Sequence, residues 1–137
     1  MKISAVIEFQ NFRLMDLNYS TKNASTNEQE VKKSSMRVNV GTTDVDKDNN
    51  AQLELEVHIS DAGENYIREI KMVILGVFKI NDVDSYTSDI EQILRANGTA
   101  IMMPYIRSLM SSITSFDDST DHILLPTMNV QEMFDSN

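Results

Sequence analysis

The stretch from residue 52 to residue 80 constrains the fold of this 137-residue chain more than any other part. Between residues 53 and 59, aliphatic side chains alternate with polar ones, and this period of two is typical of a strand with one buried face. A polar turn follows over 61–65, and residues 66–80 form a second long strand. Because positions 72–78 are apolar on both faces, we expect that strand to be central and covered on both sides.

Weaker patterns precede this pair of strands. Alternation that begins at Ile3 predicts a first strand within residues 3–19, and a short strand is expected at 36–40. The polar residues 20–35 lack a periodic apolar face and predict a long loop. The connection after the first strand carries more large apolar side chains than a solvated loop needs: Phe12, Leu14, Leu17 and Tyr19.

The apolar period changes to that of a helix after residue 85. A short helix is expected from Tyr86 to about Leu94, with a stop at Asn97-Gly98. A longer helix follows from Thr99, and its wide apolar stripe includes Met102, Tyr105, Ile106, Leu109, Met110, Ile113 and Phe116. An extended segment at 122–126 and a last helical turn at 130–134 complete the chain. Four strands followed by two main helices predict one α+β domain over 1–137, with an antiparallel sheet and the helices packed on one face.

Composition excludes several classes of protein. The chain has no cysteine, which rules out disulfides, cysteine-ligated zinc and thiol catalysis. A net charge of −9 argues against nucleic-acid binding, which needs a basic face. The longest apolar run, Met72–Phe78, is far shorter than a membrane span, and Glu8 interrupts the N-terminus before a signal peptide can form. We therefore expect a cytoplasmic protein without membrane insertion.

No catalytic or metal-binding set is readable. The acidic residues that begin at Asp44 resemble the start of a calcium loop, but Leu55 stands where a bidentate glutamate is required, which favours an ordinary acidic turn. The two histidines, His58 and His122, have no partner at metal-ligand spacing, and the serines of the long helix lack a nucleophile elbow. We expect no enzyme activity, no metal and no cofactor.

Several motifs along the chain resemble one family. The helical segment Met102-Met103-Pro104-Tyr105-Ile106-Arg107 is followed by Leu124-Leu125-Pro126 and by an ending that runs from Asn129 to Phe134. Upstream, Asp16-Leu17-Asn18-Tyr19 and Gly76-Val77-Phe78 also fit. Together they resemble the protein-export chaperone SecB, whose long helix opens with an apolar pair and then Pro-Tyr-x-Arg. Phe116-Asp117-Asp118 departs from the family, which has a glycine there, and Val130 replaces an aromatic residue.

The resemblance implies a chaperone that works without ATP as a dimer of dimers. Its partners would be unfolded or presecretory polypeptides, and also the export motor SecA, although the polar tail that helps to dock SecA is missing after Phe134. Phe12, Leu14, Leu17 and Tyr19 would wall a polypeptide-binding groove, with Met102 and Met103 as an adaptable floor. The remaining stripe, Tyr105, Ile106, Leu109, Met110 and Ile113, would form the core or a subunit interface. The alternative is a dedicated chaperone with one client, such as the antitoxin of a toxin–antitoxin system.

Overall fold

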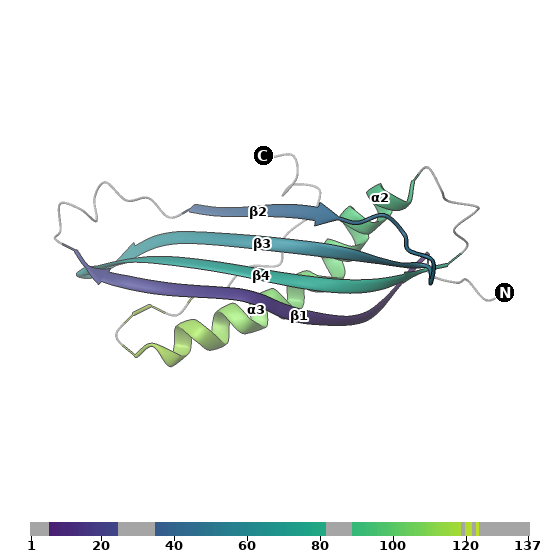
Figure 1. Cartoon of the computed structure of the whole chain (residues 1–137). Helices are drawn as coiled ribbons and strands as arrows, with labels where there is room; N and C mark the ends of the chain where they lie inside the picture. Colours follow the sequence, from purple (N-terminus) through teal and green to yellow (C-terminus); the bar gives the residue numbers. More distant parts are fainter. Residues whose placement is uncertain (1–5, 25–34, 82–88, 119, 122, 124–137) are drawn as a thin grey trace.

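The fold is a four-stranded antiparallel sheet with one long helix across one of its faces (Figure 1). The computed structural model describes residues 6–24, 35–81, 89–118, 120, 121 and 123. The predicted α+β class and antiparallel sheet are confirmed. The segments predicted at 122–126 and 130–134 lie mostly or entirely outside the described residues. The strands are β1 (Ile7–Asn23), β2 (Ser35–Thr42), β3 (Asn50–Gly63) and β4 (Tyr66–Ile80), in the order β1-β4-β3-β2.

The core lies between β3, β4 and the helix because alternate residues of both strands point to the helical layer. Leu53, Leu55 and Val57 of β3 and Met72 and Phe78 of β4 are fully buried there, as the alternation predicted. The central place of β4 is confirmed, since it lies between β1 and β3. Its other face is not covered within the described chain, where Val73, Leu75 and Val77 are partly exposed.

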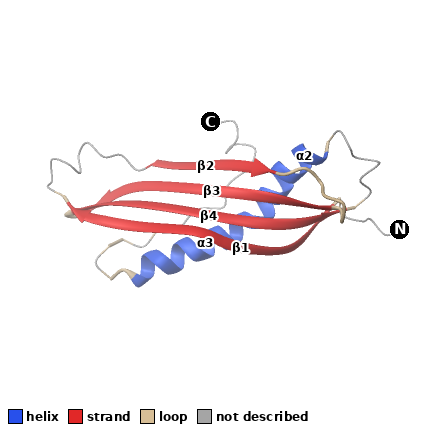
Figure 2. Ribbon diagram, in the orientation of Figure 1, coloured by secondary structure: helices blue, strands red, loops and turns tan. Residues whose placement is uncertain are grey.

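The helical layer is one continuous helix and not two separated helices (Figure 2). It consists of α2 (Ile90–Ile93), a π-helical turn η2 (Leu94–Gly98) and α3 (Thr99–Phe116). Gly98 has helical backbone angles, so the predicted stop at Asn97-Gly98 is wrong. The reason is packing: a Cβ at Gly98 would lie only 2.8 Å from a methyl carbon of Leu53. The glycine therefore serves close approach of the helix to the sheet and does not end the helix.

Strand β1 is far longer than the alternation at its start predicted. It runs on to Asn23, so the strand predicted within 3–19 is confirmed from Ile7 onward. The connection that was expected to carry Phe12 to Tyr19 and the start of the loop at 20–35 are strand instead. Its register against β4 shifts twice, between Phe9 and Asn11 and between Leu14 and Asp16. Each bulge adds one residue and reverses which sequence parity faces the helix. The helix-facing apolar residues are therefore odd-numbered before the first bulge, even-numbered between the bulges and odd-numbered again after the second, although all of them lie on the same side of the strand.

Candidate functional site

The helix-facing side of β1 carries a row of exposed apolar side chains, Phe12, Leu14 and Leu17, which we call the β1 row. Their partners on β4 are Gly76, Ile74 and Met72, all of which belong to the buried face of that strand. The row is nevertheless 43%, 42% and 36% exposed. Soluble proteins seldom leave neighbouring large apolar groups uncovered unless they bind something there. The row is therefore the candidate site.

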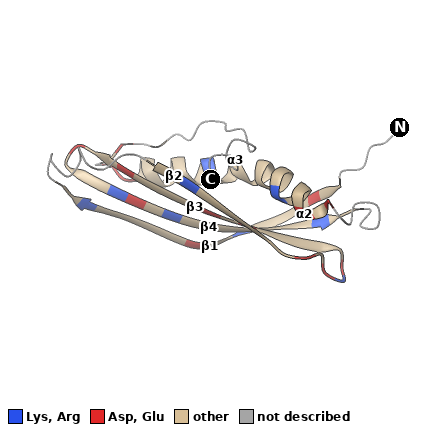
Figure 3. Cartoon of the chain, turned by 90° about the horizontal axis from the view of Figure 1, so that it is seen from above, with Lys and Arg blue, Asp and Glu red and all other residues tan. Residues whose placement is uncertain are grey.

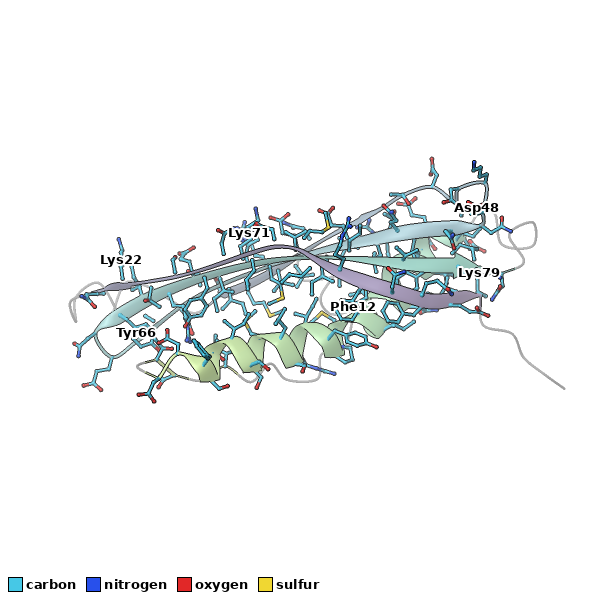
Figure 4. All side chains as sticks on the ribbon, turned by 60° about the horizontal axis from the view of Figure 1, so that its bottom comes forward. Phe12, Lys22, Asp48, Tyr66, Lys71 and Lys79 are labelled. Carbon is cyan, nitrogen blue, oxygen red and sulfur yellow. The ribbon has the colours of Figure 1, made fainter. Side chains whose placement is uncertain are left out.

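An aromatic cluster closes one end of the row. The ring of Phe12 lies 4.6 Å from that of Tyr105 on α3, and Phe9 lies 5.6 Å from both Tyr105 and Phe78, centroid to centroid. Figure 4 shows Phe12 on the helix side of the sheet, whereas Lys71 and Lys22 point away from it. The cluster joins the edge strand to the helix, and Tyr105 remains partly exposed beside the row.

A hydrogen-bonded contact closes the other end. Tyr19, two residues beyond Leu17 on the same face of β1, donates its hydroxyl proton to Asp117 Oδ2 at 2.7 Å. The same hydroxyl lies 3.3 Å from Thr120 Oγ1. Asp117 directly follows the last residue of α3. Leu14 and Leu17 thus lie between two places where β1 is tied to the helix or to the turn after it.

Next to Tyr19, a buried arginine binds the same turn. Arg68 of β4 is 1% exposed, and its guanidinium donates to Asp61 Oδ1 at 2.9 Å and to Asp61 Oδ2 at 2.7 Å. Its Nη1 donates to Thr120 Oγ1 at 3.0 Å and to the carbonyl of Asp121 at 2.9 Å. The hydrogen bonds to Asp61, and to a smaller degree the proximity of Tyr19, raise the pKa of Arg68 above its ordinary value. The arginine stays charged, and its guanidinium makes four hydrogen bonds to Asp61, Thr120 and Asp121.

Sequence reasoning missed this cluster. Its signal was present, since Arg68 occupies a position between Tyr66 and Ile70 that the alternation assigns to the buried face. A charged residue at such a position requires a partner, and a buried arginine is rarely left without one. The partners, however, come from β3 and from the turn after α3, and no local pattern indicates that these segments meet.

The other predicted site residues lie deeper. Met102 and Met103 are buried between α3 and the sheet, with Met102 packed at Gly76. Of the stripe predicted as core or subunit interface, Ile106 and Met110 are fully buried in the core of the single chain, and Leu109 and Ile113 pack against it while partly exposed. The structure therefore brings the predicted β1 residues together on one surface and places the methionines beneath it.

The outer face of the sheet differs in character, because charges of both signs are interspersed along its strands (Figure 3). His58 Nε2 lies 2.7 Å from Glu56 Oε1, and Lys71 Nζ lies 3.6 Å from the same oxygen. The hydrogen bond from His58 lowers the pKa of Glu56.

No group of three or more potential metal ligands occurs among the described residues. In the turn before β3, Asp46 Oδ1 instead accepts from the backbone N–H groups of Asp48 and Asn50.

Comparisons with known proteins agree with this architecture. The model of the family described as SecB, preprotein translocase subunit SecB, matches residues 2–137. Among solved structures, the chain is similar to the Mycobacterium tuberculosis Rv1957 SecB-like chaperone in complex with a ChAD peptide from the Rv1956 HigA1 antitoxin, with a TM-score of 0.70 at 13% identity over 89% of this chain and 90% of that one. A protein of unknown function from Streptococcus agalactiae has a TM-score of 0.50 at 11% identity over 88% of this chain and 96% of that one.

Two further findings complete the comparison. No curated protein matches the sequence. None of the described helices is long and apolar enough to cross a membrane.

Proposed function

This chain belongs to the SecB family of chaperones, and from that premise we propose that it is an ATP-independent holdase that binds unfolded polypeptides along the β1 row. The observation that carries the proposal is the row itself. Phe12, Leu14 and Leu17 are exposed side by side within a single chain, beside the partly exposed ring of Tyr105. An extended apolar segment of a client would cover them. Met102 and Met103 would then support the surface from the core.

The chemistry of such a surface suits transient binding. Full burial of an exposed apolar side chain of this size contributes about 1.5–3 kcal/mol. The members of the β1 row are already more than half covered, so each contributes less than this to binding, and association costs offset a large part of the sum. A single segment is therefore held weakly, as a chaperone that must release its client requires. Binding of the unfolded state lowers its free concentration by mass action, so no nucleotide is needed. The net charge of −9 would oppose uncontrolled aggregation of a protein that exposes apolar side chains.

In the first version of this function the clients are presecretory proteins held in the cytoplasm for export through SecA. The proposal includes no catalysis, metal, cofactor, nucleic acid or membrane insertion. The family description, a preprotein translocase subunit, supports this version.

The second version is a dedicated chaperone with one client, such as an antitoxin. It is favoured by the similarity in fold to the mycobacterial SecB-like chaperone, whose structure contains a peptide from an antitoxin. Recovery of bound proteins from the native cell distinguishes the two versions. Many unrelated unfolded chains are expected for the first, and a single repeatedly recovered protein for the second.

We further propose that the protein works as a homo-oligomer, a dimer of dimers. Strand β1 is 17 residues long and stands at an edge of the described sheet, so its outer backbone groups are available to pair with another strand. Phe116, at the end of α3, is 91% exposed, which suits a contact with a second copy. Static light scattering measures the mass: a tetramer is expected, and a strict monomer contradicts this part of the proposal.

The function is tested by suppression of client aggregation, followed by light scattering. The variant Leu14→Ser/Leu17→Ser removes two members of the β1 row, and Met15→Ser is the matched control because it removes an equally exposed apolar side chain of the same strand, at a bulge. The wild type and the control should suppress scattering alike, with roughly tenfold more of the double variant needed. Absence of suppression by the wild type at stoichiometric excess contradicts the proposal, as does an equal loss in the control.

A further inference from the structure

The turn that follows α3 is fastened to the sheet by side chains from two strands. Tyr19 of β1 and Tyr66 and Arg68 of β4 bind Asp117, Thr120 and Asp121 of the turn, and we call this set of six residues the latch. We propose that Tyr19 is a positioning residue: through its hydroxyl it holds the turn, with Arg68, and so fixes the end of α3 opposite the β1 row. This inference rests on the proposed function, since the row is the client surface.

Burial of Arg68 makes the latch strong. A guanidinium that is 1% exposed must have its N–H groups satisfied, because an unpaired buried donor is costly. Asp61 accepts from Nε and Nη2, and the turn supplies the acceptors for Nη1. If the turn left the sheet, Nη1 would lose both partners. By supplying two acceptors for Nη1, the turn helps to make burial of the Arg68 side chain energetically possible.

The latch also engages the turn from other sides. The backbone N–H of Asp121 donates to the hydroxyl oxygen of Tyr66 at 2.9 Å, and the Tyr66 ring lies 5.5 Å from the guanidinium carbon of Arg68. Beyond the latch, the backbone N–H of Ile123 donates to Thr114 Oγ1 of α3, also at 2.9 Å. The turn is therefore bonded both to the sheet and back to the helix that it follows. Moving it would move the last turns of α3.

Tyr19 lies between the turn after α3 and the β1 row, the proposed client surface. Leu17 and Tyr19 are successive helix-facing residues of β1, and the Tyr19 hydroxyl reaches the residue at the end of α3. The phenol has two parts with separable roles: a ring that a client can contact and a hydroxyl that the turn binds. A ring contact survives replacement by phenylalanine, whereas a positioning role does not.

The experiment uses the full chain with Tyr19→Phe, Asp117→Asn and the double variant. Asp118→Asn is the matched control, because it makes the same charge change at the exposed neighbouring residue. Two quantities are measured: hydrogen exchange at the amides of Asp121 and Ile123, relative to the core amide of Ile74, and the dissociation constant of a fluorescently labelled, permanently unfolded polypeptide.

If the inference holds, Tyr19→Phe lowers protection of the two turn amides roughly tenfold, as expected for loss of a hydrogen bond to a charged group. The same variant should weaken client binding about fivefold. The double variant should bind no more weakly than Tyr19→Phe, because both substitutions act on one shared hydrogen bond: Tyr19→Phe removes its donor, and Asp117→Asn replaces its charged acceptor with a neutral one. Asp118→Asn should match the wild type in both measurements.

Two outcomes overturn the inference on its own. Wild-type client affinity in Tyr19→Phe would show that only the ring matters, and unchanged protection of the turn amides would show that the hydroxyl does not hold the turn. A wild type that binds no client overturns the proposed function and the positioning role together. The exchange data then still report separately whether the latch exists, so the two failures are distinguishable.

Discussion

Strands β4 and β1 are neighbours, paired along almost their whole lengths, yet they use their apolar residues differently. Along β4 the buried and partly exposed positions alternate without interruption from Tyr66 to Ile80. Along β1 the alternation is interrupted by two bulges, and the residues facing the helix include the exposed β1 row. The comparison shows that the regular strand builds the core, whereas the interrupted edge strand leaves apolar groups available for binding.

The arrangement of the helix explains the difference. Figure 1 shows α3 crossing the sheet obliquely, so that its C-terminal part emerges beyond the edge strand β1. The described contacts between β1 and the helical layer include the Phe12–Tyr105 ring contact and the Tyr19–Asp117 hydrogen bond. Between them, Leu14 and Leu17 face the helical side but stay accessible. The β1 row is thus left exposed for two reasons: β1 is an edge strand of the described sheet, and α3 crosses the sheet obliquely instead of running along β1.

The largest expected effect comes from deleting one residue in each strand. Deleting Val73 from β4 turns half of the strand over, so that either Ile74, Phe78 and Ile80 or the residues before them face solvent. Three such side chains contribute about 1.5–3 kcal/mol each, which approaches a whole domain's stability of about 5–15 kcal/mol. We expect no cooperative unfolding transition by circular dichroism.

The matched deletion is Gln10 of β1, the extra residue of the first bulge. Without it, Phe9, Phe12 and Leu14 keep their side of a strand that becomes regular as far as Leu14, so the variant should fold and unfold cooperatively. If both deletions are tolerated, or if both abolish folding, the proposed difference between the regular strand β4 and the bulged strand β1 is contradicted.

Truncation of one leucine in each region should have the next largest effect. Leu55→Ala leaves a cavity in the core and should lower the free energy of unfolding by about 3 kcal/mol. Leu14→Ala removes a side chain that is already half in water and should cost less than about 1 kcal/mol. Urea denaturation measures both, and equal costs would mean that the β1 row belongs to the core.

Removal of the buried cation tests the end of the sheet where the two strands meet the turn. Arg68→Met leaves the carboxylate of Asp61 without its partner and should lower the free energy of unfolding by about 2 kcal/mol in urea denaturation. This is below the about 3–5 kcal/mol of a fully buried pair because Asp61 retains some solvent contact. Adding Asp61→Leu removes the unpaired charge and should restore part of the loss. A double variant less stable than Arg68→Met contradicts this explanation.

The smallest effect is expected on the outer face, where charges are solvated. The hydrogen bond from His58 lowers the pKa of Glu56 below its ordinary value of 4.5. Because the folded pKa is the lower one, the contribution of Glu56 to stability is present above pH 4.5 and is lost as the pH falls through the folded value. The difference in Tm between wild type and Glu56→Gln should therefore shrink below pH 4.5, and a difference that grows there would contradict the assignment.

The sequence predicted the central part of the fold because β3 and β4 obey one period throughout. Leu53 to Ile59 could be assigned to a buried face without knowledge of any other segment. The β1 row could not be assigned to one face of a strand, because Phe12 and Leu17 fall on different parities once a bulge adds one residue between them. The excess of large apolar side chains in that segment was nevertheless visible in the sequence.

Two other features depended on distant parts of the chain. Gly98 looked like the end of a helix, but its lack of a side chain serves the approach of the helix to Leu53. Arg68 lies within a regularly alternating strand, but its partners are Asp61 and a turn more than fifty residues away. Both are decided by packing between segments, which a local period cannot report.

The central claim, that unfolded clients bind on the helix-facing side of β1, is tested most directly by photocrosslinking from adjacent positions of that strand. Leu14 faces the helical side and Arg13 faces the outer side of the sheet. A photoreactive side chain at position 14 should crosslink a permanently unfolded polypeptide, and the same group at position 13 should not. Crosslinking from position 13 alone, or equally from both positions, would contradict the account.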